Sequence, residues 1–268
     1  MGCTMYLEQS LKKLRLSQFI ENYSATAIIA EQQKQSMVEY LNTLVNLELE
    51  TRAKNKLQRL LKKSGIRSYK SLAEFDCSEV PSLSPSQLYE LGEGKFIENA
   101  GNLLIFGATG TGKSHLCSGL AYKWCMLDKK VYYTTASQLM SDLSGVGKDV
   151  FKKQLQRQDV IIIDDLLWHD YNQLDLNLLL SLITNCYEVK SIVLSAHLPF
   201  GQWAKILKDE TLAITMVDKL IHHATILELN TESYRVKSAQ KNLKKQLKKE
   251  DKKAEIEKFE NHTMDASV

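Results

Sequence analysis

The sequence predicts an α/β domain with a five-stranded parallel sheet, preceded by a small all-helical domain. Three observations favour this fold class. Short apolar runs alternate with helical patterns from about residue 100 onward, a glycine-rich loop joins one such run to a helix, and leucines recur at helical spacing in the first part of the chain. Alternating strands and helices are typical of a parallel sheet with helices on both faces.

The first part of the chain, residues 1–70, is expected to fold into helices. Leu7, Leu11 and Leu14 recur at helical spacing, and a second helix is expected to open with the capping box formed by Ser36 and Glu39. Gly65 fits the end of that helix, because glycine readily adopts the left-handed conformation of a helix stop. We therefore expect a helical domain that binds DNA or a partner.

Basic residues concentrate in two segments of a chain whose net charge is only +3. Residues 52–70 hold eight Lys and Arg and no acid, and residues 237–253 hold eight Lys against two acids. Such charge suits a polyanion, because neutralising phosphates releases counterions; a solvated helix face is the alternative. The candidate DNA contacts are Arg52, Lys56, Arg59, Lys62, Lys63 and Arg67.

Residues 71–99 are expected to form a connector, marked by Pro81 and by Ser84-Pro85, which resembles a helix start. Residues 100–237 then form the α/β domain, and residues 238–268 a Lys-rich tail. The expected strands are 102–106, 131–134, 160–163, 192–194 and 225–229. A ligand is expected at the carboxyl ends of these strands.

The segment after the first expected strand is a complete phosphate-binding loop that opens a helix. Its glycines let successive N–H groups surround phosphates, and the helix adds its positive end. Lys113 can reach the β and γ phosphates, and the Ser114 hydroxyl suits Mg²⁺. The candidate nucleotide contacts are Gly107, Ala108, Thr109, Gly110, Thr111, Gly112, Lys113, Ser114 and His115.

Two carboxylates follow the third expected strand. We assign Asp164 to the metal and Asp165 to the attacking water, since a phosphate-loop enzyme needs both functions. His197 follows the next strand and is the candidate contact of the γ phosphate or the water, while Lys219 and Arg235 are later cations that can neutralise phosphate charge.

The five cysteines include no CxxC pair, which argues against a disulfide framework or a zinc site. His169, His222 and His223 show no metal-binding spacing, so we expect them to be surface or packing residues. No apolar run approaches the ~18 residues of a membrane span, and the N-terminus lacks a signal-peptide pattern. We expect a cytoplasmic protein without a membrane partner.

Together these motifs resemble the IstB-like ATPases, relatives of the helicase loader DnaC within the AAA+ class. The resemblance runs from near the N-terminus to about Lys237 and leaves out the Lys-rich tail. It rests on residues 110–116, Thr134 to Ala136, residues 159–165, Leu198 to Phe200 with Trp203, Leu220 to Ala224, Ser233 to Arg235 and the Phe75-Asp76 connector.

The resemblance implies an AAA+ fold, ATP and Mg²⁺ as ligands, assembly into a homo-oligomer, binding to duplex DNA, and a role as the helper ATPase of a transposase. It places Lys113 and Ser114 in Walker A, Asp164 and Asp165 in Walker B, His197 at sensor 1, Lys219 at the trans-acting finger and Arg235 at sensor 2.

Three positions differ from the family's usual residues, and all three are positions that the resemblance assigns to ATP hydrolysis. Asp165 replaces Glu, His197 replaces Asn, and Lys219 replaces Arg, which loses the planar fork that spans two oxygens. We therefore expect hydrolysis to be slow, catalysed by Lys113 with those residues and Arg235. Two alternatives stay open: an ATP-gated DNA-binding scaffold with little hydrolysis, and a DnaC-like loader of a replicative helicase.

Overall fold

The computed structural model describes residues 2–66, 69–166, 171–203, 207, 209–230 and 233. The chain divides into two compact units, Met1–Lys63 and Ser64–Val268. The predicted DNA contact Arg67, the predicted sensor 2 residue Arg235 and the tail at 238–268 lie outside the described residues. None of the helices that are described is long and apolar enough to cross a membrane.

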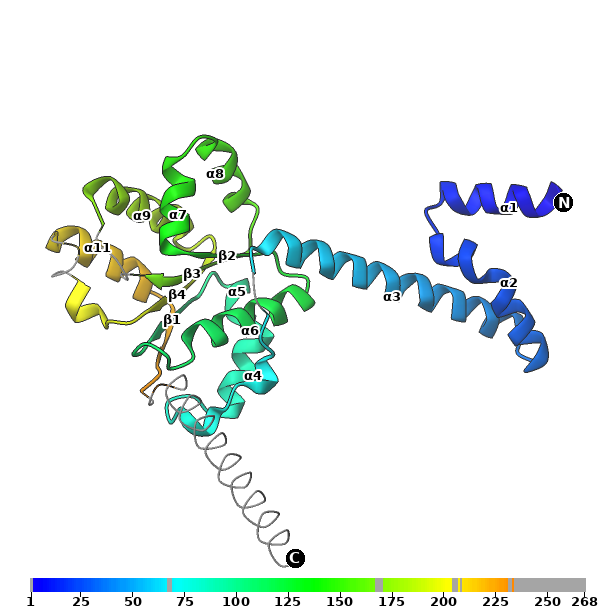
Figure 1. Cartoon of the computed structure of the whole chain (residues 1–268), viewed down its shortest axis with the longest axis horizontal. Coiled ribbons are helices and arrows are strands. Elements are labelled where there is room, and N and C mark those ends of the chain that lie inside the picture. The colour runs from blue at the N-terminus through cyan, green and yellow to red at the C-terminus, as the bar shows by residue number, and fades with distance from the viewer. Residues whose placement is uncertain are drawn as a thin grey trace, which may run out of the picture. The chain divides into compact units, whose positions relative to one another are not determined.

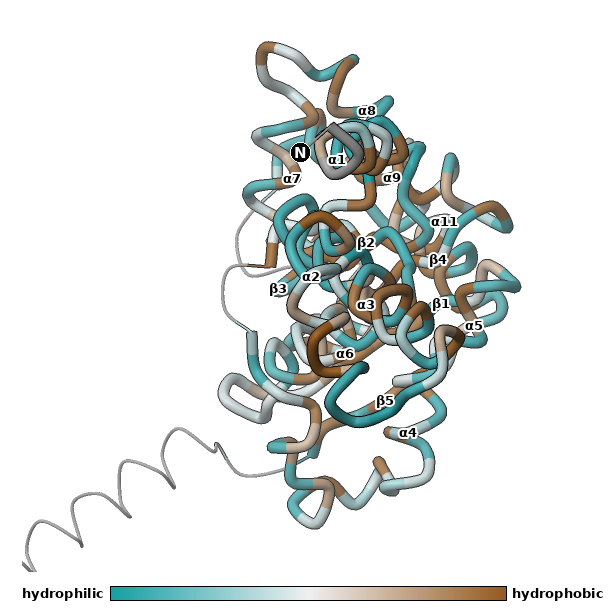
Figure 2. Tube along the Cα trace, turned by 90° about the vertical axis from the view of Figure 1, so that its right-hand side faces the viewer, coloured by the Kyte–Doolittle hydropathy of each residue, from teal (hydrophilic) through white to brown (hydrophobic). Residues whose placement is uncertain are grey.

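The N-terminal unit is helical, as the leucine spacing predicts. It contains α1 (Gly2–Lys13), α2 (Ser17–Gln32) and α3 (Met37–Ser64). The expected capping box opens α3: the Ser36 N–H donates to Glu39 at 2.7 Å, and the Glu39 N–H donates back to Ser36 Oγ at 3.3 Å. Both hydrophobic (brown) and hydrophilic (teal) residues occur in α3 (Figure 2). Gly65 follows with φ +80, which confirms the expected helix stop.

A buried carboxylate ties the helices of this unit together. Glu48 on α3 is 5% exposed and accepts a hydrogen bond from the Gln18 N–H at the start of α2 at 2.9 Å. Arg52 pairs with the same carboxylate at 2.7 Å and donates to the carbonyl of Arg15 at 2.7 Å. Arg52 therefore helps to hold the turn between α1 and α2 against α3.

The second unit is a five-stranded parallel sheet with helices on both faces (Figure 1). A connector with short 3-10 turns at Leu72–Glu74 and Cys77–Glu79 precedes it. The elements that follow are α4 (Pro85–Glu93), α5 (Lys95–Glu98), β1 (Asn102–Phe106), α6 (Lys113–Met126), β2 (Val131–Thr135), α7 (Ala136–Ser144), α8 (Lys148–Gln156), β3 (Val160–Leu166), α9 (Gln173–Cys186), β4 (Ser191–Ala196), α11 (Glu210–Ile221) and β5 (Ala224–Glu228).

The strand order is β2-β3-β4-β1-β5, and every pairing is parallel. Each of the five expected strands is confirmed to within two or three residues at its ends. β1 lies between β4 and β5, and β4 lies between β1 and β3. Residues that follow β1, β3 and β4 must therefore meet at one edge of the sheet, because parallel strands share their carboxyl edge.

The core lies on both faces of the sheet. One cluster joins alternate residues of β1, β3 and β4 to α7, α9 and α11, and α6 packs on the opposite face. Trp124 on α6 is fully buried, and its indole N–H donates to the carbonyl of Leu91 on α4 at 2.9 Å. Gly94 ends α4 with φ +66, and a Cβ there would lie 2.9 Å from the Trp124 ring. This packing anchors α6, whose first turn forms the site.

Candidate functional site

The phosphate-binding loop spans residues 107–112 between β1 and α6, where the spacing predicts it. The nine candidate nucleotide contacts, Gly107 to His115, are contiguous there. Gly112 has φ +98, and a Cβ there would lie 3.2 Å from the ring of Phe75. The loop thus needs glycine both for its backbone conformation and for the close approach of the connector.

The connector packs directly on this loop. The Phe75 ring meets the His115 ring edge to face with centroids 5.5 Å apart, and His115 Nε2 lies 3.0 Å from the carbonyl oxygen of Ser71. The chain that follows β5 also reaches the loop: a side chain at Gly110 would collide with the Ser233 hydroxyl. Two segments distant in sequence therefore border the loop.

Lys113 begins α6 and is 5% exposed. Its ammonium donates hydrogen bonds to the carbonyls of Gly107 at 2.7 Å and Ala108 at 2.9 Å. The positive charge of Lys113 therefore already lies inside the loop, beside the backbone groups that would surround a phosphate. A phosphate oxygen can take over these hydrogen bonds, and the ion pair formed is stronger than a bond to a carbonyl.

Asp164 lies near the end of β3, is 4% exposed, and is held by two hydroxyl groups. The Tyr133 hydroxyl on β2 donates to Asp164 Oδ2 at 2.6 Å, and the Ser195 hydroxyl on β4 donates to Asp164 Oδ1. Burial, aided by the Asp164 charge, raises the pKa of the Tyr133 phenol, so Tyr133 remains a donor. These bonds fix the carboxylate and balance part of the cost of burying it.

Sequence reasoning missed Tyr133 and Ser195. Ser195 is completely buried near the carboxyl end of β4, and a hydroxyl directly after the apolar run Ile192 to Leu194 was the available signal. Cys117 on α6 is also buried close by, and burial together with the charges of Asp164 and Asp165 raises the pKa of its thiol well above the ordinary value. Cys117 is therefore an inert thiol beneath the site.

Asp165 differs from its neighbour because its side chain is exposed. Its backbone has φ +55, at an irregularity in the pairing of β3 with β4. The Asp165 N–H donates to Ser195 Oγ at 2.9 Å and to Asp164 Oδ1 at 3.2 Å. The backbone of Asp165 is thus held by the buried residues Asp164 and Ser195. The exposed carboxylate of Asp165 is accessible to a water molecule.

His197 directly follows β4, between the loop and the two aspartates. The Gly107 N–H donates to the carbonyl of Ala196 at 3.3 Å, so the residue before His197 contacts the first loop residue. Leu166 at the end of β3 pairs with the same Ala196. The fold therefore brings Lys113, Ser114, Asp164, Asp165 and His197 to one edge of the sheet.

Lys219 lies at the opposite edge. It is in the last turn of α11, just before β5 begins, and its ammonium is 4.6 Å from the centroid of the Tyr187 ring, which precedes β4. These are the amino ends of the strands. Lys219 therefore cannot join the loop of its own chain in this arrangement.

A cavity of about 550 Å³ adjoins the loop on the side of β2. Its lining includes Ser114 and His115 of α6, Tyr133 and Thr135 of β2, and Lys70. The volume lies in the range of small-molecule sites. The Ser114 hydroxyl and the Asp164 carboxylate are hard oxygen donors, which is the ligand chemistry that Mg²⁺ prefers.

Comparison with known proteins gives the family of the chain. Residues 9–242 match the model of the family described as IstB-like ATP binding protein. An insertion-sequence ATP-binding protein of Sinorhizobium fredii is 30% identical over 234 residues, covering 85% of this chain and 78% of the relative. The ATP-binding protein of insertion sequence IS5376 from Geobacillus stearothermophilus is 30% identical over 229 residues, covering 84% of this chain and 91% of the relative.

Two solved structures share the fold of the second unit. DnaI has a TM-score of 0.51 at 15% identity, covering 63% of this chain and 90% of its own. AMPPCP-bound DnaA from Aquifex aeolicus has a TM-score of 0.52 at 18% identity, covering 68% of this chain and 56% of its own. The fold is therefore that of an AAA+ P-loop domain, and the chain belongs to the family of IstB-like ATP-binding proteins.

Proposed function

We propose that this protein is an ATPase that assembles into a homo-oligomer on duplex DNA and acts as the helper of a transposase in insertion-sequence transposition. The observation that carries the proposal is the division of the catalytic groups between two edges of the sheet. The loop, both aspartates and His197 share one edge, and Lys219 lies at the other. A complete site then requires the Lys219 edge of a neighbouring subunit.

In this proposal each residue has a separate task. Lys113 pairs with the β and γ phosphates, and Asp165 orients the attacking water. Ser114 and Asp164 would hold Mg²⁺, which neutralises charge on the phosphates when bound. His197 contacts the γ phosphate or the water. Lys219 of a neighbouring subunit, with Arg235, stabilises the charge that develops on the transferred group.

The test is steady-state ATP turnover with and without duplex DNA, with the mass of the assembly recorded in both states. We expect turnover to rise with DNA as the assembly forms. A Lys113→Ala variant defines the background. If the parent hydrolyses ATP no faster than the Lys113→Ala variant, the hypothesis that the protein is an ATPase is wrong, whether or not the protein binds DNA.

The departures at Asp165, His197 and Lys219 favour a second candidate, a DNA-binding scaffold that ATP assembles but that turns over little ATP. The same experiment separates the two. ATP-dependent assembly on DNA with background turnover would support the scaffold, while a rate that depends on Lys113 would support the ATPase.

The basic end of α3 is our candidate DNA contact. Lys56, Arg59 and Lys63 are exposed and recur at helical spacing, which places them on one face. Replacing Arg59 and Lys63 with alanine is expected to weaken duplex DNA binding and lower the slope of log K against log salt by about 2, because each phosphate contact contributes about 0.9. Fluorescence anisotropy at several salt concentrations measures both.

The matched control replaces Lys12 and Lys13, two exposed lysines on α1 of the same unit. If the control lowers affinity as much as the Arg59 and Lys63 pair does, net charge alone explains binding. An unchanged slope in the Arg59 and Lys63 variant would exclude this face as the contact. ATP affinity is expected to stay at the parent value in both variants.

Replacing Lys219 with arginine is expected to raise DNA-stimulated turnover by at least about tenfold. A guanidinium can bind two phosphate oxygens, and the added charge-assisted hydrogen bond is worth roughly 1.5 kcal/mol. Arginine can also keep the contact with the Tyr187 ring. Lys129→Arg, which replaces an ion-paired lysine elsewhere in the unit, is the control. Unchanged or lower turnover would argue against Lys219 as the trans-acting group.

A further inference from the structure

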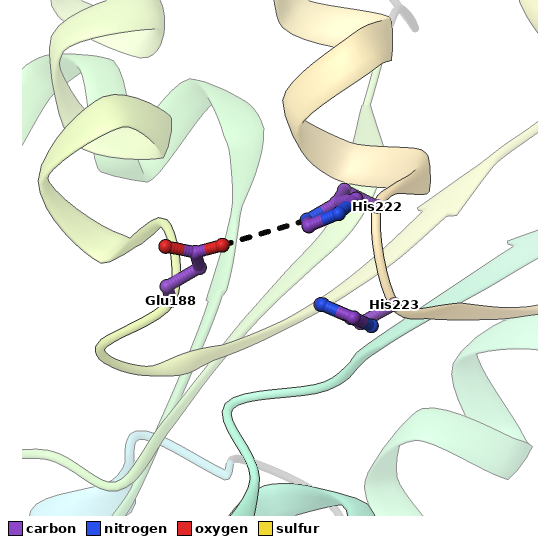
Figure 3. A group of neighbouring side chains, drawn as sticks. All are labelled: Glu188, His222 and His223. Carbon is purple, nitrogen blue, oxygen red and sulfur yellow. Dashed lines mark ion pairs between the residues drawn. The ribbon is translucent and has the colours of Figure 1, made fainter.

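A second cluster of chemically active side chains lies away from the nucleotide site. Glu188, His222 and His223 are exposed, and one ligand atom from each lies within 4.8 Å of the other two (Figure 3). Sequence reasoning set the two histidines aside because no spacing supported a metal. The structure supplies the third group, since Glu188 lies 34 positions before His222 in the chain.

The fold places these residues firmly. Glu188 follows α9 in the turn that leads to β4, and the two histidines join α11 to β5. Asn102 at the start of β1 locks this junction: its N–H donates to the carbonyl of His223 at 3.1 Å, and its side-chain amide donates to the carbonyl of Leu220 at 3.0 Å. The cluster therefore rests on the amino edge of the sheet, and its backbone is fixed before any ligand binds.

The spacing of the donor atoms suits a metal ion. Glu188 Oε1 and His222 Nδ1 are 3.7 Å apart. Two ligands of a tetrahedral Zn²⁺, each at about 2.0–2.1 Å, are separated by about 3.3 Å. Side chains that are 48% and 58% exposed can close the difference by small rotations. The rings of His222 and His223 have centroids 4.0 Å apart, so the second imidazole is also within reach.

We propose that Glu188, His222 and His223 form a binding site for a divalent transition metal of the Zn²⁺ class. Two imidazoles and one carboxylate, with water in the fourth position, form a donor set that Zn²⁺ accepts, whereas Mg²⁺ prefers oxygen donors alone. The Tyr187 hydroxyl lies 2.9 Å from His222 Nδ1 and orients the ring before the metal binds. The metal then replaces this hydrogen bond.

The site is separate from the nucleotide loop, because the two lie at opposite edges of the sheet. Lys219 lies near the cluster: its ammonium is 4.6 Å from the centroid of the Tyr187 ring, and the Tyr187 hydroxyl contacts His222. The proposal does not depend on ATP hydrolysis or on DNA binding. Its test therefore uses the protein without nucleotide and without a histidine tag.

The experiment is a titration of the full chain with Zn²⁺ and with Co²⁺, in excess Mg²⁺ to occupy sites made of oxygen alone. Calorimetry gives affinity and stoichiometry, and the visible spectrum of the Co²⁺ form reports the donor atoms. The variants are His222→Ala, His223→Ala and Glu188→Gln, with Glu90→Gln on α4 as the matched carboxylate control. Circular dichroism confirms that each variant is folded.

We expect one Zn²⁺ per chain, a Co²⁺ spectrum with nitrogen and oxygen ligands, and affinity lowered more than about tenfold in each site variant but not in the control. Zn²⁺ should also raise the melting temperature of the parent and not that of the His222→Ala variant, since a ligand of the folded state stabilises it. Parent-like affinity in the His222→Ala, His223→Ala and Glu188→Gln variants would overturn the proposal. Thiolate charge-transfer bands from Co²⁺ would do so as well, because they would assign binding to cysteines.

Discussion

Replacing Lys113 with alanine is expected to weaken ATP binding by about 10- to 150-fold. A hydrogen bond to a charged group contributes about 1.5–3 kcal/mol, and each 1.4 kcal/mol changes affinity tenfold. The ammonium of Lys113 already lies inside the loop, bonded to the carbonyls of Gly107 and Ala108, so the parent needs little rearrangement to pair with a phosphate. Titration with a fluorescent ATP analogue in the presence of Mg²⁺ measures the loss.

The control for this result is Lys123→Ala on the same helix, which removes a partly exposed lysine paired with Glu93. We expect the control to bind ATP as the parent does. Thermal unfolding of both variants without nucleotide shows whether the Lys113 variant also loses stability, since its loop carbonyls lose their partner. Parent-like ATP affinity in the Lys113 variant would mean that the triphosphate does not lie in this loop.

Replacing Asp165 with asparagine is expected to lower ATP turnover by about 10²- to 10⁴-fold, the contribution typical of a positioned general acid or base. ATP affinity should stay near that of the parent, because the exposed Asp165 side chain is not needed for the backbone hydrogen bonds to Ser195 and Asp164. Asparagine also tolerates the left-handed conformation of this residue. Single-turnover and equilibrium-binding measurements separate the two effects.

Asp128→Asn is a matched control, because Asp128 is an exposed aspartate with a similar φ of +64 at the end of α6. Its turnover should equal that of the parent. A contrasting variant, Asp164→Asn, should lose stability as well as turnover, since an amide has one acceptor oxygen for the two hydroxyls and the N–H that now bond the carboxylate. Parent-like turnover in Asp165→Asn would remove Asp165 from the water-positioning role.

The fold could be predicted from the sequence because its central strands β1, β3 and β4 contain short apolar runs buried on both faces. Such runs stand out between helical patterns, and the capping box at Ser36 and the helix start at Ser84-Pro85 form as the sequence predicts. The phosphate-binding loop could also be predicted from the sequence, because its residues are contiguous and their spacing follows from how a backbone surrounds phosphates.

The parts of the site that escaped prediction depend on contacts between distant segments. Tyr133 and Ser195 reach Asp164 from strands about 30 residues away on either side, and only the order of the strands brings them together. Glu188 joins the two histidines for the same reason. Arg52 was a candidate DNA contact because it belongs to a basic run. In the structure its guanidinium contacts Glu48 and the carbonyl of Arg15, both inside its own unit.

The close packing of Ser233 on Gly110 has a mechanical consequence. The Leu229 N–H donates to the carbonyl of Phe106 at 2.7 Å, so the strand that ends the sheet also ends against the start of the loop. Because the Ser233 hydroxyl fills the space beside Gly110, a shift of the loop toward Ser233 would have to push that residue away. Movement of the loop on this side is therefore limited by the residues that follow β5.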